Sequence, residues 1–117
     1  MIDIRPHVAE LLASLNAQIE PEYRDTFVTF PLIVLTEIDN AGTISDCTEV
    51  YSTITLQVDS YTLDKKETLD LAASVDEILT ANGFKRRGGR PLKDGELERY
   101  TATYDVYVYK QDTIMTN

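Results

Sequence analysis

Cysteine and histidine are nearly absent from this sequence of 117 residues, and basic residues are a clear minority. Cys47 is the only cysteine, so the chain has no internal disulfide, which fits a reducing site of synthesis. The only histidine is His7, and one histidine cannot build a zinc site. With 11 Lys and Arg against 20 Asp and Glu, the formal net charge of -9 disfavours wrapping DNA by bulk charge.

Long apolar runs and a basic leader are also missing. No run approaches the ~20 residues that span a bilayer, and the N-terminal MIDIRPHVAELL carries Asp3 where a secretory signal has a basic head. We therefore expect no membrane association and no secretory signal. The 43% hydrophobic and 26% charged content predicts a single globular domain over residues 1–117.

The first segment has helical spacing. Asp3 is a candidate cap and Pro6 lies near the first turn, where a missing N–H costs nothing. Pro21 disfavours helix at the residue before it and ends the segment. The predicted apolar face of this helix consists of Val8, Leu11, Leu12, Leu15 and Ile19.

Two strands should follow. The apolar run PLIVLTEI, from Pro31, predicts a strand buried on both faces for part of its length. The sequence DNAGTISD offers turn residues, which place a hairpin turn at Asn40 to Gly42. A return strand from about Thr48 to Tyr61 alternates between apolar and polar residues, so one face should be core and the other wet.

The segment LDKKETLDLAASVDEILTANGF predicts the clearest helix, with Asp64 and Glu67 at capping-box spacing and Gly83 at its C-terminal end. A short strand from about Phe84, a glycine-bearing bend and a last strand from about Glu98 to Lys110 complete the chain. The order α-β-β-α-β-β predicts an α+β two-layer sandwich. In it, two helices cover one face of a four-stranded sheet, largely antiparallel or mixed.

Catalytic equipment is hard to find. His7 lies in the first turn of a helix, where the dipole opposes its charged form, and nothing suggests a base beside Cys47. The acidic residues lack calcium-loop spacing, and no Gly-Lys-Ser/Thr follows Gly88-Gly89. We therefore predict a protein that is not an enzyme and that has no catalytic residue, no metal and no cofactor.

The predicted sheet surface favours an interface. Tyrosines on the outward-facing set of the long strands are good strand residues, and protein interfaces are also enriched in them. A basic segment, KRRGGR, stands out from the acidic chain and invites an acidic patch on a second copy. The candidate interface residues are Tyr51, Tyr61, Tyr107, Tyr109, Lys85, Arg86, Arg87, Arg90, Asp39, Asp46 and Glu49.

Two other interpretations of the basic segment stay open. Its side chains are simply exposed at a glycine-permitted turn, or they form a small nucleic-acid-binding module together with Lys93. The α-β-β-β-α order of double-stranded-RNA-binding domains is a poor match to a chain that ends in strands.

The succession of elements is similar to a known group of phage proteins. A helix, the strand FPLIVLTEID, the strand YSTITLQVDSY, the helix TLDLAASVDEILTANGF, the segment KRRGGR and the strand ERYTATYDVYVYK follow in order. Between Val8 and Lys110 this order resembles the tail terminator and tail completion (tail-to-head joining) proteins of long-tailed bacteriophages and prophages. The lambda minor tail protein U belongs to that group.

The resemblance implies a non-enzymatic virion protein, assembled in the host cytoplasm. Such proteins form a ring, typically a hexamer, at the head-proximal end of the tail tube. The implied partners are sister copies, the tail-tube protein and the head-completion or connector protein. The genome passes through the lumen without specific binding, which an acidic lining suits. Another head–tail connector or minor tail protein is the neighbouring expectation.

Overall fold

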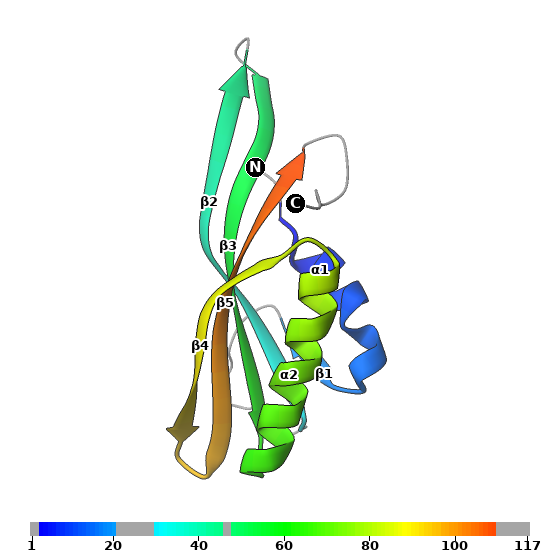
Figure 1. Ribbon diagram of the computed structural model, residues 1–117, viewed down its shortest axis with the longest axis vertical. Helices are drawn as coiled ribbons and strands as arrows, with labels where there is room; N and C mark the ends of the chain where they lie inside the picture. Colours follow the sequence, from blue (N-terminus) through cyan, green and yellow to red (C-terminus); the bar gives the residue numbers. More distant parts are fainter. Residues whose placement is uncertain (1–2, 21–29, 46–47, 110–117) are drawn as a thin grey trace.

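Two helices and five strands form the described part of the protein (Figure 1). The computed structural model describes residues 3–20, 30–45 and 48–109. The helices are α1 (Arg5–Leu11) and α2 (Lys65–Ala81), and a 3₁₀ helix covers Ala13–Leu15. The strands are β1 (Gln18–Glu20), β2 (Leu32–Ser45), β3 (Thr48–Thr62), β4 (Lys85–Asp94) and β5 (Leu97–Tyr109).

The strands make one mixed sheet in the order β1-β2-β3-β5-β4. β1 pairs parallel to β2, and the other three pairings are antiparallel. The α+β class is therefore confirmed, whereas the expected four strands are wrong because β1 adds a fifth.

The first helix is shorter than its apolar spacing predicts. α1 ends at Leu11, the 3₁₀ helix follows, and Asn16 adopts a left-handed conformation (φ 57°) that redirects the backbone. Ile19 consequently lies in β1 and packs on the core from a strand. Pro6 lies in the first turn as expected, but the N-cap is Ile4; Asp3 Oδ1 instead accepts from the Arg5 backbone N–H at 3.1 Å.

The second helix follows its sequence signals closely. Asp64 is the N-cap, and its side chain accepts a hydrogen bond from the Glu67 N–H at 3.1 Å. At the other end Gly83 has φ 91°, and the Phe84 N–H reaches the Leu79 carbonyl at 3.0 Å. This pattern is a Schellman motif, which satisfies the last carbonyl groups of α2.

Both predicted turns of the sheet are wrong. Residues 40–42 continue β2 and pair with Ile54, Thr53 and Ser52 of β3, so the hairpin reverses after Ser45. The connecting residues Asp46 and Cys47 lie outside the described residues.

The basic segment also belongs to a strand, because β4 continues through Gly88 and Gly89 with a bulge at Arg87. The chain reverses instead after Asp94, where Gly95 has φ 65°.

Both helices pack on the same face of the sheet (Figure 1). The alternation of β3 and β5 was correctly predicted, since Ile54, Leu56 and Val58 face the helices together with Tyr104 and Val106. The buried residues of this main core are Ile4, Val8, Leu12, Ile33, Leu35, Ile54, Leu56, Val58, Val75, Leu79, Phe84, Ala102, Tyr104, Val106 and Val108.

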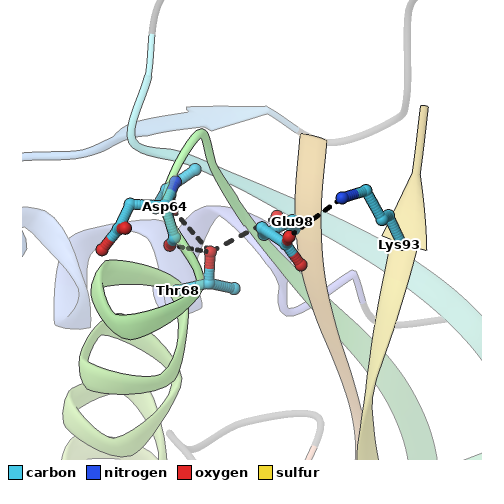
Figure 2. Close-up of polar contacts among 5 residues, drawn as sticks. Asp64, Thr68, Lys93 and Glu98 are labelled. Atoms are coloured by element: carbon cyan, nitrogen blue, oxygen red, sulfur yellow. Dashed lines mark hydrogen bonds and ion pairs between the residues drawn. The ribbon is translucent and has the colours of Figure 1, made fainter. Parts of the chain in front are cut away.

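A buried threonine fixes the start of α2 to the sheet (Figure 2). The Thr68 hydroxyl lies 2.5 Å from the Thr62 hydroxyl, 3.0 Å from the Asp64 carbonyl and 3.4 Å from the Glu98 carbonyl of β5. Glu98 also forms an ion pair with Lys93 of β4, with Nζ and Oε1 3.6 Å apart. The N-terminus of α2 is thereby joined to Thr62, the last residue of β3, and to the β4–β5 hairpin.

Candidate interaction surface

The face of the sheet opposite the helices, called the open face below, carries mainly polar side chains. Strand register places Thr36 of β2, Gln57 of β3 and Thr103 of β5 in one row across it, and all three are partly exposed. Tyr107 lies on the same face with 40% of its surface exposed. The backbones of Tyr51 and Tyr109 pair with each other, and their side chains lie outside the described part.

One end of the open face is buried, contrary to the expectation of a wet surface. Tyr61 is 3% exposed because Leu32 and Val34, on the same face of β2, pack with it in a second small cluster with Phe30 and Leu97. This burial also confirms that β2 begins as a strand covered on both faces, since Leu32 to Leu35 are all buried. An alternating pattern alone cannot reveal such a cluster, because a tyrosine suits either environment.

An ion pair between the partly exposed Arg99 and the buried Asp59 closes this end of the open face. The Arg99 Nη2 lies 3.2 Å from Asp59 Oδ1, and Gln57 Nε2 donates to Asp59 Oδ2 at 2.9 Å. The Arg99 guanidinium carbon lies 5.7 Å from the centroid of the Tyr61 ring, within the range of a cation–π contact. Tyr61 and Asp59 therefore stabilise the fold itself in the single chain.

The basic segment forms an exposed outer strand, called the basic edge below. It is defined by Lys85, Arg86, Arg87, Arg90 and Lys93 of β4, all exposed. Register and ion pairs place Arg86 and Lys93 on the helix side, whereas Lys85, Arg87 and Arg90 belong to the open face. The prediction that these cations cluster is confirmed, but the sequence analysis expected a bend where the structure has a strand.

Part of the positive charge of the basic edge is offset within the chain. Arg86 Nε lies 3.7 Å from Asp76 Oδ1, Arg87 Nε lies 3.5 Å from Asp105 Oδ2, and Lys93 makes the pair with Glu98 already described. Such exposed pairs contribute little to stability, but they weaken the field that a phosphate backbone would meet. In the described residues, Lys85 and Arg90 form no ion pair.

Asp76 also holds the buried tyrosine beneath the basic edge. The Tyr104 hydroxyl donates to Asp76 Oδ1 at 2.9 Å. Burial, and then this hydrogen bond to a carboxylate, raise the pKa of Tyr104 well above its usual range. Asp76 therefore links the core tyrosine of β5 to Arg86 at the surface, which positions the Arg86 side chain on the helix side of β4.

The opposite margin of the sheet carries acidic residues, called the acidic edge below. It consists of Glu20 of β1 with Glu37 and Asp39 of β2, and Asp39 is exposed. Of the predicted acidic patch, Asp39 lies here, Asp46 lies outside the described residues, and the Glu49 side chain is likewise not described. Glu49 of β3 pairs through its backbone with Ile44 of β2, beyond the acidic edge.

Sequence reasoning missed Glu20 and Glu37 as surface candidates. Neither lies in the expected hairpin turn, and only the position of β1 and β2 at the margin of the sheet groups them with Asp39. Knowledge of the strand order and pairing register would have grouped these two residues with Asp39.

Within the described ranges, no three His, Cys, Asp or Glu side chains gather as a metal site would require. Neither of the two helices described is both long and apolar enough to cross a membrane. The sequence matches no protein-family model and no curated protein.

Proposed function

We propose that the chain is a structural virion protein of a long-tailed phage or prophage, acting as a tail terminator or tail completion protein. In this role, copies form a ring at the head-proximal end of the tail tube, stop polymerisation of the tube protein and join the tail to the head connector. The element order of the sequence suggests this role. The chain fits it as a one-sided sheet, because the helices occupy one face (Figure 1). The other face carries mainly polar side chains beyond its buried end at Tyr61.

The single observation that carries the proposal is this open face, polar beyond its buried end at Tyr61, with oppositely charged margins in the described residues. An uncovered sheet surface rimmed by opposite charges is suited to heterologous contacts, which close into a ring when the rotation allows. An acidic chain also suits a lumen through which DNA passes without being held.

Deleting the reading frame from the phage or prophage that encodes it tests the proposal. Electron microscopy of the lysate should show overlong tails without attached heads, and supplying the chain in trans should restore normal virions. Mass spectrometry of purified wild-type tails should detect the chain in fixed proportion to the tube protein. Normal virions from the deletion strain, or tails that lack the chain, would refute the role.

The exposed basic edge supports one alternative, a nucleic-acid-binding module. Because three of its five cations are offset by neighbouring carboxylates, we expect no retention of duplex DNA at physiological ionic strength. A gel-shift titration across salt concentrations measures this. Tight, salt-dependent binding that Arg86→Glu with Arg87→Glu abolishes would favour the alternative over the virion role.

A further inference from the structure

The two margins of the sheet carry opposite charges in the same rows. A row here is the set of residues that pair across successive strands. Asp39 of β2 pairs with Thr55, Thr55 with Asp105, and Asp105 with Lys85 of β4. One row thus begins on the acidic edge and ends on the basic edge.

The next row repeats the arrangement on the other side of the sheet. Glu37 pairs with Leu56, Leu56 with Tyr104, and Tyr104 with Arg86. Leu56 and Tyr104 face the helices, so Glu37 and Arg86 are both on the helix side. In the first row, the Thr55 hydroxyl donates to Asp105 on the open face, so Asp39 and Lys85 share that face.

A third row, on the open face, joins the two edges further along. Glu20 of β1 shares it with Arg90 of β4, through Val34, Asp59 and Thr101. Three acids on one edge therefore match three bases on the other, row by row and face by face.

Both edges are open to a partner in the described part of the chain. β4 pairs with β5 alone, and its residues are exposed except Leu92 and the undescribed Asp94 side chain. At the other edge, the described pairing of β2 with β1 stops at Val34. Beyond it, Ile38 and Asp39 of β2 are exposed.

We propose that copies of this chain associate edge to edge, with the basic edge of one copy against the acidic edge of the next. β4 runs antiparallel to β5, and β5 and β2 are each antiparallel to β3, so β4 of one copy meets β2 of the next antiparallel when the copies share one orientation. If the next copy is related to the first by a rotation with no displacement along the strand direction, Lys85 lies opposite Asp39 and Arg86 lies opposite Glu37. The inference deepens the proposed function by naming the surface between its subunits.

The same charges disfavour the symmetric alternative. Two basic edges repel each other, so a dimer that pairs β4 with β4 is disfavoured. The contact is therefore heterologous and leaves one edge of each kind open for further copies.

Charge-swap complementation with the full chain tests the interface. One variant carries Lys85→Glu with Arg86→Glu, and the other carries Glu37→Lys with Asp39→Lys. Each variant alone opposes like charges, which should raise the dissociation constant at least about 100-fold over the wild-type chain. Mixed in equal amounts, they restore opposite charges at every contact and should assemble with strictly alternating subunits.

Two matched controls change the net charge equally away from both edges. Lys65→Glu with Lys66→Glu, and Asp70→Lys with Glu77→Lys, alter exposed side chains of α2 and should associate like the wild-type chain. Analytical ultracentrifugation at low ionic strength, over a range of concentrations, measures association. Thermal unfolding of each variant verifies that it folds, and recovery of assembly on mixing verifies this independently.

The proposal is overturned in any of three ways. The wild-type chain stays monomeric up to about 1 mM, a concentration that detects even weak association. Either edge variant alone assembles like the wild type, or the mixture fails to recover assembly. These outcomes are separate from the deletion experiment: edge association without a tail phenotype refutes the virion role alone, and a tail phenotype without edge association refutes this interface alone.

Discussion

Gly88 and Gly89 are adjacent residues of the exposed strand β4, yet the structure predicts opposite effects when each is changed to alanine. Neither has a left-handed backbone conformation, so the new methyl group alone decides the outcome. A Cβ at Gly89 would lie 2.8 Å from both Cε1 and Oη of Tyr100 and 3.1 Å from the Thr101 carbonyl oxygen. A Cβ at Gly88 would meet no atom within 4 Å.

The magnitude follows from which atoms must move. A comfortable carbon contact needs about 3.5–4.0 Å, so the Tyr100 ring has to shift by roughly 1 Å. That ring packs against the main core, and overpacking of this kind costs about 1–3 kcal/mol. Either alanine also restricts the unfolded chain, which stabilises by about 0.4–1 kcal/mol. Gly89→Ala should therefore lose about 1–2 kcal/mol, and Gly88→Ala should gain up to about 1 kcal/mol.

Urea unfolding followed by circular dichroism gives both free energies of unfolding. The double variant with Tyr100→Ala supplies the decisive control, because removing the ring should abolish most of the cost of Gly89→Ala. If Gly89→Ala unfolds like the wild type, or if its cost persists without the ring, the packing of Tyr100 on Gly89 is not the reason for glycine at this position.

Four further substitutions, one of them a comparison at an exposed ion pair, test other parts of the fold by the same unfolding measurement. Thr68→Val should cost about 1–2 kcal/mol, because the buried Thr62 hydroxyl loses one partner while it keeps Asp64; an unchanged stability would contradict the role of this junction. Arg99→Met should cost about 3 kcal/mol by leaving the Asp59 carboxylate buried without its cation, whereas Lys93→Met, at an exposed pair, should change stability by less than about 1 kcal/mol; equal effects would refute the distinction. Gly83→Ala should cost about 1–2 kcal/mol because φ is 91° there, and a neutral result would mean that the end of α2 rearranges without penalty.

The sequence predicted best where local chemistry alone decides the structure. Asp64 and Gly83 mark the ends of α2 because a carboxylate cap and a left-handed glycine act within one turn of helix. The alternation of β3 and β5 predicted their buried faces for a similar reason, since side-chain direction follows strand geometry.

Prediction failed where distant contacts override local preference. Gly42 and Gly88-Gly89 resemble turns in isolation, but pairing with neighbouring strands keeps each in an extended conformation. β1 is only three residues long and owes its existence to β2. Only part of the candidate surface was predictable, because the basic residues are adjacent in the sequence. The position of Glu37 in the same row as Arg86 appears only when the register of four strands is known.

The second small cluster makes the two ends of β2 unequal. Its first residues, Leu32 to Leu35, are enclosed on both sides of the sheet, whereas Ile38, Asp39 and Ala41 further along are exposed. We therefore expect amide hydrogens at the enclosed end to exchange with solvent more slowly than those beyond it. The strand that bears two of the three acidic-edge residues is thus enclosed at its first residues and solvent-exposed further on, so the proposed edge contact would form at the end of β2 that lies away from the interior.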